Sequence, residues 1–291
     1  MRKNRMICAV LLSLGLLLTA CGQTEETKND QSPNVEEEVV SKNVENDAAE
    51  DEGKEAPEET PKEKTSSSEH ENSEPDMEYE LTKKIYKENN ITISYPQISN
   101  LADEAKQTEI NDLLFIEAYK VMNFYPETEG LELEIDYTIS FQNPYFLSAQ
   151  YSGMGFVEGT AHPSHMFYTT NIDVTNAKRI KLIDVVIPSE AFVELFKSDA
   201  FRAVNPDHEG MAKELKEYVT ASDFENADSL DDIGTEKHSE AFSYFTENAL
   251  GISIGVSHAA GGYAAFEINY NDLPSDLVVE KDILELLKIV E

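Results

Sequence analysis

Strict alternation of apolar and polar residues marks the clearest element of the chain, at residues 131–142. In LELEIDYTISFQ every odd-numbered position is apolar or aromatic and every even-numbered position is polar or charged. A period of two over this length predicts an antiparallel strand with one buried and one solvent-exposed face. Residues 145–151 follow Asn143-Pro144 and are predicted to form its hairpin partner.

Shorter apolar runs predict the other strands. We expect them at residues 91–95, 166–174, 179–182, 241–245, 250–256 and 264–270. The first is expected to end at Pro96, because proline cannot donate a hydrogen bond to a neighbouring strand.

Apolar residues at helical spacing predict helices between and after these strands. The expected helices lie at residues 101–124, 189–204, 207–220 and 281–290. Asn100 is the expected cap of the first helix, with Asp103 in support, and Ser189 and Asp207 are expected to cap the next two. The polar residues 223–236 are expected to form a loop. Runs of strands with helices inserted, rather than strict β-α-β alternation, predict an α+β fold of antiparallel sheets packed with helices.

The first residues indicate where the protein resides. A positive head at residues 1–5 precedes an apolar run at 6–18 that is too short to span a bilayer, and Leu-Thr-Ala-Cys follows. This order resembles the signal peptide and lipobox of bacterial lipoproteins. The resemblance implies cleavage after Ala20 and lipidation of Cys21 by acyl chains such as palmitate. We therefore expect residues 1–20 to be removed and the protein to be anchored by its lipid, extracytoplasmic, on the outer face of the bacterial cell membrane.

Charge and composition predict a disordered acidic tether at residues 21–78. Between positions 22 and 76 the chain has 19 acidic and five basic residues, and it lacks the apolar surface that would offset the entropy of ordering. The whole chain has a formal charge of −34 at pH 7, which makes nucleic acid a poor partner. The remaining residues suit one compact unit with two parts, which we place at 79–186 and 187–291.

The order of the expected elements is similar to that of a known pair of extracytoplasmic domains. An Ile-Ser-Tyr-Pro strand, a long helix and an alternating strand precede the turn GTAHP at 159–163 and a strand ending in NIDV at 171–174. Two helices and a hairpin then lead to FEINYNDL at 266–273. This order resembles DUF4163 in the first part and DUF3298 in the second. These domains occur in lysozyme-sensing anti-sigma factors of the RsiV type and beside the catalytic domain of PdaC-type peptidoglycan deacetylases.

The chain departs from the family pattern at several positions. Thr160 replaces a second glycine, the turn at 176–178 is Asn-Ala-Lys rather than Thr-Gly-Lys, and the loop at 257–263 lacks a proline-tyrosine lead-in. We expect neither an anti-sigma segment nor a deacetylase domain. The resemblance therefore implies a fold, a cell-envelope setting, and binding of lysozyme or of peptidoglycan.

Candidate site residues crowd together in only one stretch, residues 155–174. His162 and His165 lie three positions apart, with Pro163 between them. Three interpretations stay open: a structural turn with an imidazole bonded to the backbone, a partner-binding surface, and a metal or catalytic site. The nominal metal ligands are His162, His165 and His258 with Glu158 or Asp173. Zinc needs three or four ligands in close geometry, and His-x-x-His is a weak pattern outside a helix.

No catalytic motif is evident. Gly-x-Ser-x-Gly occurs once, at residues 251–255, but inside the strand expected at 250–256 rather than at a turn from a strand to a helix. No thiol is expected in the mature protein, and Ser164 has no evident acid to orient a base beside it. We therefore predict a non-enzymatic module, without cofactor or metal, that binds an envelope protein such as lysozyme or a cell-wall glycan. The expected binding surface comprises His162, Pro163, His165, Tyr168, His258 and Tyr263.

Two other functions stay open at this point. One is a cell-wall hydrolase that depends on a metal or on paired carboxylates, and the other is a structural scaffold lipoprotein. Glu132, Glu134 and Asp136, on the exposed face of the alternating strand, are a further candidate patch for a basic protein such as lysozyme.

Overall fold

The computed structural model describes residues 35–36, 79–279 and 281–287. The predicted signal peptide, Ala20 and Cys21 lie outside these residues, as does the predicted tether apart from Val35–Glu36. No helix in the part of the chain that is described is long and apolar enough to cross a membrane.

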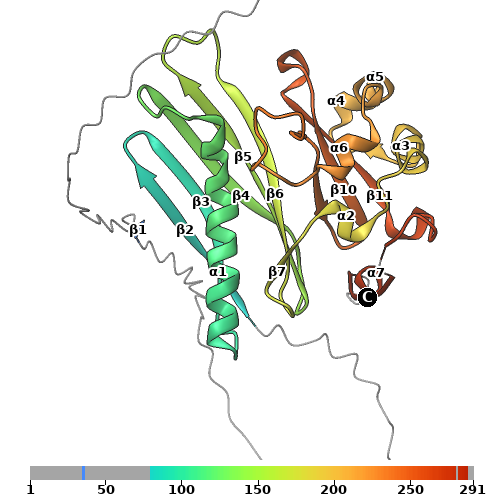
Figure 1. Cartoon of the computed structure of the whole chain (residues 1–291), viewed down its shortest axis with the longest axis horizontal. Coiled ribbons are helices and arrows are strands. Elements are labelled where there is room, and N and C mark those ends of the chain that lie inside the picture. Colours follow the sequence, from blue (N-terminus) through green and yellow to red (C-terminus); the bar gives the residue numbers. More distant parts are fainter. Residues whose placement is uncertain (1–34, 37–78, 280, 288–291) are drawn as a thin grey trace, which may run out of the picture. The chain divides into compact units, whose positions relative to one another are not determined.

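Seven strands form one sheet, in the order in which they follow one another along the chain (Figure 1). They are β1 (Val35–Glu36), β2 (Glu80–Glu88), β3 (Ile91–Ser99), β4 (Leu131–Gln142), β5 (Phe146–Val157), β6 (Ser164–Asp173) and β7 (Lys178–Ile180). Neighbouring strands are antiparallel except β3 and β4, which pair in parallel. Helix α1 (Glu104–Tyr119) and the 3-10 turn η1 (Lys120–Phe124) connect these two strands, because parallel neighbours need a crossover connection.

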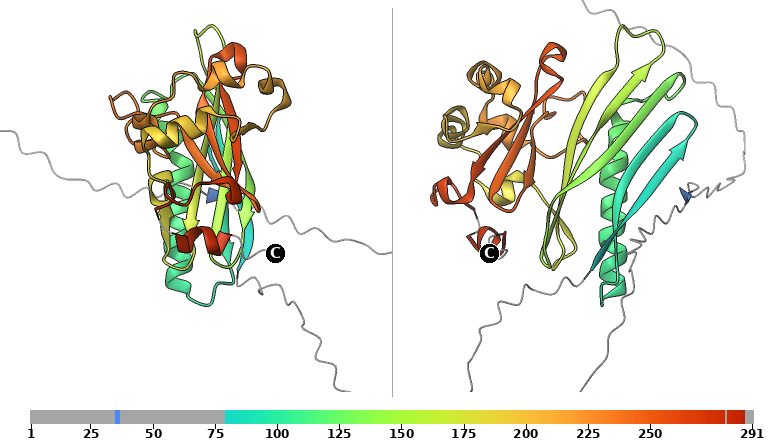
Figure 2. Two further views of the ribbon diagram at one scale, coloured as in Figure 1. Left: turned by 90° about the vertical axis from the view of Figure 1, so that its right-hand side faces the viewer. Right: turned by 180° about the vertical axis from the view of Figure 1, so that it is seen from behind.

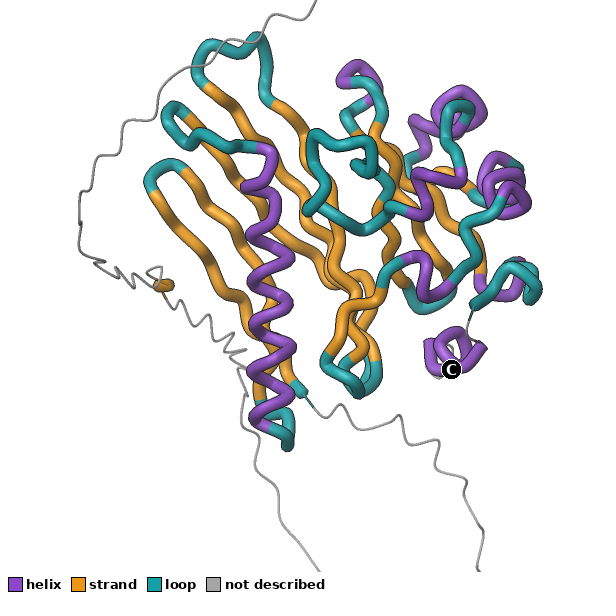
Figure 3. The backbone as a smooth tube through the Cα atoms, viewed as in Figure 1, coloured by secondary structure: helices purple, strands orange, loops and turns teal. Residues whose placement is uncertain are grey.

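A second sheet has four strands, all antiparallel to their neighbours. Its order is β8 (Arg202–Ala203), β11 (Tyr263–Asn269), β10 (Ala249–Gly255) and β9 (Phe242–Phe245). The accompanying helices are α2 (Leu182–Val185), α3 (Glu190–Lys197), α4 (Pro206–Glu209), α5 (Ala212–Lys216), α6 (Ala221–Glu225) and α7 (Lys281–Leu287), with the short 3-10 turns η2 (His258–Ala260) and η3 (Tyr270–Asp272). Figures 2 and 3 show α3 and α5 on the side of this sheet that faces away from the seven-stranded one. The predicted α+β fold is confirmed.

Helix α1 covers one face of the seven-stranded sheet. Leu133 and Ile135 of β4 pack with Tyr151 of β5 and Ala118 of α1 in one hydrophobic cluster. The alternation predicted for residues 131–142 is confirmed, since Leu131, Leu133 and Ile135 are buried while the acidic residues between them are exposed. The face of β4 that carries these acids is turned away from α1.

The first strands differ from the prediction. Strand β2 was not predicted, because ELTKKIYKE is largely exposed and lacks a clear alternation. Strand β3 continues through Pro96 to Ser99, contrary to the expected end. Its pairing with β4 stops at Ile93, so beyond that point β3 has a strand partner on one side only. A proline is tolerated at such an edge, because its missing N–H removes no hydrogen bond there.

The predicted helix caps are correct at Ser189 and wrong at two other positions. Asp103, rather than Asn100, caps α1, and its carboxylate accepts hydrogen bonds from the N–H groups of Ala105 and Lys106. Asn205, rather than Asp207, caps α4 by accepting a bond from the Asp207 N–H. An N-cap side chain accepts bonds from the N–H groups two or three residues further along the chain, which sets the position of the cap.

The helices of the second half are shorter than predicted. The helix predicted at 189–204 ends at Lys197, because Arg202–Ala203 pair with β11. The helix predicted at 207–220 is two short ones separated near Gly210, a residue that disfavours helix interiors. The first residues of the loop predicted at 223–236 are helical instead, because they belong to α6. Thr220 and Asp223 form a capping box at the start of this helix.

A buried aspartate joins the two sheets. One carboxylate oxygen of Asp228 accepts a bond from the Ser243 N–H of β9 at 2.5 Å, and the other accepts from the Leu182 N–H at 2.7 Å and from the Ser243 hydroxyl. Ser243 in turn accepts bonds at its carbonyl from Thr169 and Asn171 of β6. This network holds β9 against β6 and thereby positions the surfaces described next.

Candidate functional site

Three histidines meet at the surface. The rings of His162 and His258 stack with their centroids 4.2 Å apart and their planes 9° apart, and the His165 ring lies 5.6 Å from His258. All three side chains are exposed. The turn before β6 and the loop between β10 and β11 therefore lie side by side.

Glycine shapes the loop that carries His258. Gly261 and Gly262 both have positive φ, +100° and +86°, which a residue with a side chain rarely adopts. A Cβ on Gly262 would lie 3.0 Å from the Cβ of His165. The loop can approach β6 this closely because residue 262 has no side chain.

An aromatic pair lies beside the histidines. Phe167 of β6 and Tyr263 of β11 stack with their centroids 4.7 Å apart, and Phe167 also meets the edge of Tyr244. Phe167 and Tyr263 are half-buried. The pair is a contact between the two sheets that keeps part of its surface accessible.

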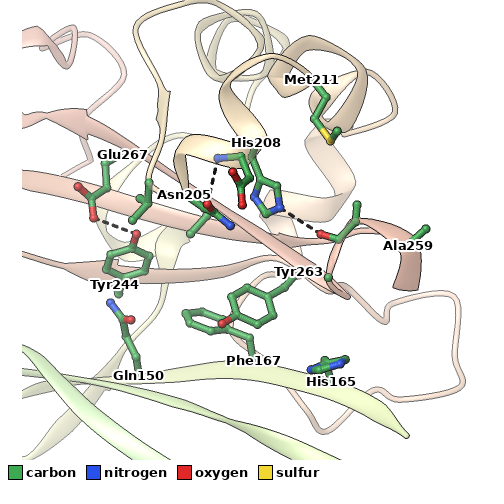
Figure 4. Close-up of a pocket in the computed structure, with 15 residues that line it drawn as sticks. Gln150, His165, Phe167, Asn205, His208, Met211, Tyr244, Ala259, Tyr263 and Glu267 are labelled. Carbon is green, nitrogen blue, oxygen red and sulfur yellow. Dashed lines mark hydrogen bonds between the residues drawn. The ribbon is translucent and has the colours of Figure 1, made fainter. Parts of the chain in front are cut away.

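A pocket of about 650 Å³ opens next to this pair (Figure 4). The seven-stranded sheet contributes Gln150, His165 and Phe167; the four-stranded sheet contributes Tyr244, Tyr263 and Glu267; and α4 with its preceding loop contributes Asn205, Asp207 and His208. This volume lies within the range of small-molecule and side-chain binding sites in proteins.

Several polar groups of the pocket are already engaged. The Tyr244 hydroxyl donates to Glu267 at 2.9 Å, and the Nε2–H of His208 donates to the Ala260 carbonyl at 3.1 Å (Figure 4). Burial raises the pKa of the Tyr244 phenol, and the neighbouring Glu267 carboxylate raises that pKa further. Tyr244 therefore keeps its proton at neutral pH. The Nδ1 atom of His208 is buried and has no hydrogen-bond partner.

A smaller pocket of about 330 Å³ shares three residues with the first: His165, Phe167 and Tyr263. Phe124, Tyr125, Glu240 and Ser253 are among its other lining residues. The Tyr125 hydroxyl and the Ser253 hydroxyl are buried without a hydrogen-bond partner. The aromatic pair thus borders two pockets at the junction of the sheets.

Tyr168 is buried behind this surface and lines the smaller of the two pockets. Its side chain is 2% exposed, and its hydroxyl donates to the Ala118 carbonyl of α1 at 2.7 Å. Burial raises the pKa of this hydroxyl well above its usual value. Side chains alternate along a strand, so Tyr168 faces α1 while Phe167 faces the pocket.

Pro163 is half-buried and lies apart from the pocket of the aromatic pair. It lines a shallow groove with Glu132, Glu134 and Met154, which connects the histidine turn to the acidic face of β4. Asp136, the third acid of that face, is paired with Lys83 at 2.9 Å.

The histidine turn has a local backbone contact. Nδ1 of His162 lies 3.3 Å from the Pro163 carbonyl. Within residues 35–36, 79–279 and 281–287, no group of three or more His, Cys, Asp or Glu side chains is arranged to hold a metal ion. Because the rings of His162 and His258 are stacked, their faces point toward each other and their ring nitrogens do not.

The sequence did not point to most of the pocket. Gln150, Tyr244 and Glu267 come from three different strands, Asn205 and His208 come from the start of α4, and none of them carries a local motif. One feature of the sequence could have pointed to the pocket. Phe167 lies in the predicted strand directly after the candidate turn, where its side chain must face the opposite side from that of Tyr168.

Of the comparisons with known proteins, only the one with solved structures finds matches. No family model matches the chain, and no curated protein matches it. A solved member of the DUF3298 family from Bacteroides fragilis NCTC 9343 has a TM-score of 0.46 and 14% identity, over 72% of this chain and 97% of that one. A DUF3298 family protein from Pseudomonas aeruginosa PAO1 has a TM-score of 0.39 and 14% identity, over 69% and 93% of the two chains.

Proposed function

We propose that this chain is a non-catalytic binding module on the outer face of a bacterial cell membrane, anchored through a lipid on Cys21. Its partner is an envelope protein, with lysozyme as the first candidate, or cell-wall glycan. The observation that carries the proposal is the pocket of about 650 Å³ beside the exposed His162–His258 stack.

The arrangement of this surface supports recognition. Half-buried aromatic rings that border a pocket, with exposed polar groups around them, are typical of binding hot spots. Phe167 and Tyr263 provide such rings, and His162, His165 and His258 lie at their edge. The residues come from two sheets that the Asp228 network joins, so the surface is preorganised.

The polar groups of the pocket favour binding over proton transfer. The Tyr244 hydroxyl donates a hydrogen bond to Glu267, His208 donates one to a carbonyl, and Asn205 caps α4. A general acid or base needs to be free to exchange a proton with a substrate. The Tyr244 hydroxyl, the Nε2–H of His208 and the Asn205 amide oxygen are instead engaged in holding the walls of the pocket.

The anchor and the linker complete the proposal. The lipobox-like Leu-Thr-Ala-Cys motif supports lipidation at Cys21, and two or more acyl chains give a stable membrane anchor. The acidic segment that follows has the composition of an extended chain. It would let the binding surface reach partners some distance from the membrane.

A cell-wall assay tests the choice between binding and hydrolysis. The purified chain is incubated with isolated cell walls, and both the protein that sediments and the soluble wall fragments are measured. We expect no release of fragments. Any sedimentation should be lost in a His162→Ala/His258→Ala double variant and kept in Tyr218→Ala, which removes an aromatic ring that is 83% exposed elsewhere. Fragment release that depends on the chain would contradict the proposal.

A further inference from the structure

We infer that the pocket of about 650 Å³ receives a cationic group of the partner, the guanidinium of an arginine or the ammonium of a lysine. This inference rests on the proposed function and specifies the chemistry by which that surface recognises a protein. Three independent features of the pocket support it: its charge, its unsatisfied acceptor and its aromatic walls.

The charge of the pocket is negative. Asp207 and Glu267 both line it, and none of its lining residues is lysine or arginine. Arg202 stands opposite Glu267 in the pairing of β8 with β11, but its side chain is exposed and forms no ion pair in the described part of the chain. A partner cation would therefore give Asp207 and Glu267 an ion pair that neither has within the described residues.

His208 adds a buried acceptor. Its side chain is 8% exposed and lines the pocket. The carbonyl of Ala260 can only accept a hydrogen bond, so Nε2 carries a hydrogen, and in the neutral imidazole Nδ1 is then left with a lone pair. Buried acceptors in proteins are nearly always paired, and Nδ1 has no partner here. A bound N–H donor would satisfy it.

The aromatic walls suit a cation. Phe167, Tyr244 and Tyr263 line the pocket, and Figure 4 shows their rings gathered on one side of it. A guanidinium or ammonium group over such rings gains cation–π attraction, which increases when the site is shielded from water. Arginine fits best, because its planar group stacks on rings while it donates to carboxylates in the same plane.

A glycan fits these features less well. A saccharide also stacks on aromatic rings, but its hydroxyl groups need donors as well as acceptors from the protein. The strongest hydrogen-bonding groups here are acceptors: two carboxylates and the His208 lone pair. A neutral sugar can donate hydroxyl hydrogen bonds to Asp207 and Glu267, but it cannot neutralise their charge.

The test uses N-acetyl-arginine amide as the probe and the full-length chain labelled with ¹⁵N. The amide signals of Gly261 and Ala265, which line the pocket, should shift in a saturable way. N-acetyl-citrulline amide, which has the same shape without the charge, should bind at least about tenfold more weakly, since hydrogen bonds to charged groups are about twice as strong as neutral ones.

Charge-removing variants locate the effect. Glu267→Gln keeps an oxygen for the Tyr244 hydroxyl, and Asp207→Asn keeps the shape of α4. Each should weaken binding of the arginine probe by about tenfold. Glu209→Gln is the matched control, because Glu209 is an exposed acid of the same helix that does not line the pocket.

Four results would overturn the inference. They are equal binding of the citrulline probe, equal weakening by Glu209→Gln, binding of chitotetraose at these amides without binding of the arginine probe, and no shift with any probe. If the chain still binds lysozyme or cell walls in a way that depends on His162 and His258, then the proposed function stands and the cationic pocket alone is wrong.

Discussion

At the scale of single residues, neighbours along β6 serve opposite purposes. His165 and Phe167 face the pocket, whereas Met166 and Tyr168 are buried in the core beneath α1. The division follows from the alternation of side chains along a strand. It means that one strand both anchors the helix and presents the candidate binding surface.

Gly262 is predicted to be indispensable to that surface. Gly262→Ala would have to adopt a φ near +86° and would bring a methyl group 3.0 Å from the His165 Cβ. Strain of the backbone alone costs about 1 kcal/mol or more, and the close contact should also displace the loop and separate His258 from His162. We expect a lower melting temperature and altered imidazole signals in NMR spectra.

Gly234→Ala separates the two effects. Gly234 also has a positive φ, +79°, but no atom lies within 4 Å of the position of its Cβ. It should lose similar stability and leave the histidine signals unchanged. If Gly262→Ala changes the histidine signals no more than Gly234→Ala does, then the close approach at Gly262 does not hold the loop.

At the scale of elements, the sequence predicts the bounds of a strand or helix correctly where consecutive residues set them, and less well where contacts with distant residues set them. Strand β4 matches its predicted bounds, because alternation is written into consecutive residues. Strand β2 was missed because it is largely exposed and lacks alternation, although it pairs with the adjacent β3. The early end of α3 could not be predicted, since it depends on pairing of Arg202–Ala203 with the distant β11. The turn and loop that carry His162 and His258 were recognised as possible neighbours, but the inward direction of Tyr168 required the register of β6.

Tyr168→Phe tests the link between β6 and α1. It removes the bond to the Ala118 carbonyl, which should lower the free energy of unfolding by about 1 kcal/mol in urea titrations and leave partner binding unchanged. Tyr137→Phe is the control, because the Tyr137 hydroxyl makes no hydrogen bond in the described part of the chain and should cost little. Loss of binding in Tyr168→Phe at unchanged stability would mean that Tyr168 contacts the partner after all.

At the scale of the whole described unit, the candidate site exists because two sheets meet. The lining residues of the pocket range from Gln150 to Glu267, and most come from elements without a motif. No local pattern can reveal such a pocket, because it depends on the contact between β6 and β9 through Ser243. The sequence could therefore identify the histidine turn but not the pocket beside it.

Asp228→Asn should weaken the junction of the sheets. The carboxylate accepts N–H bonds at both oxygens, from Ser243 and Leu182, and an amide would place its NH₂ group against one of these donors. We expect a loss of about 2 to 4 kcal/mol in the free energy of unfolding. The exposed Asp276→Asn should change it by less than about 0.5 kcal/mol. Equal effects of the two substitutions would show that the Asp228 network does not hold the sheets together.

Calorimetric titration of the full-length chain with a basic c-type lysozyme, at low and at moderate salt, tests recognition of an envelope protein most directly. The account predicts saturable one-to-one heat that persists at moderate salt and is lost in the His162→Ala/His258→Ala variant. Salt screens attraction between exposed charges over about 10 Å, so heat that disappears with salt would reflect only the net charge of −34. Such a loss, or binding that the double variant leaves intact, would contradict recognition of lysozyme by this surface.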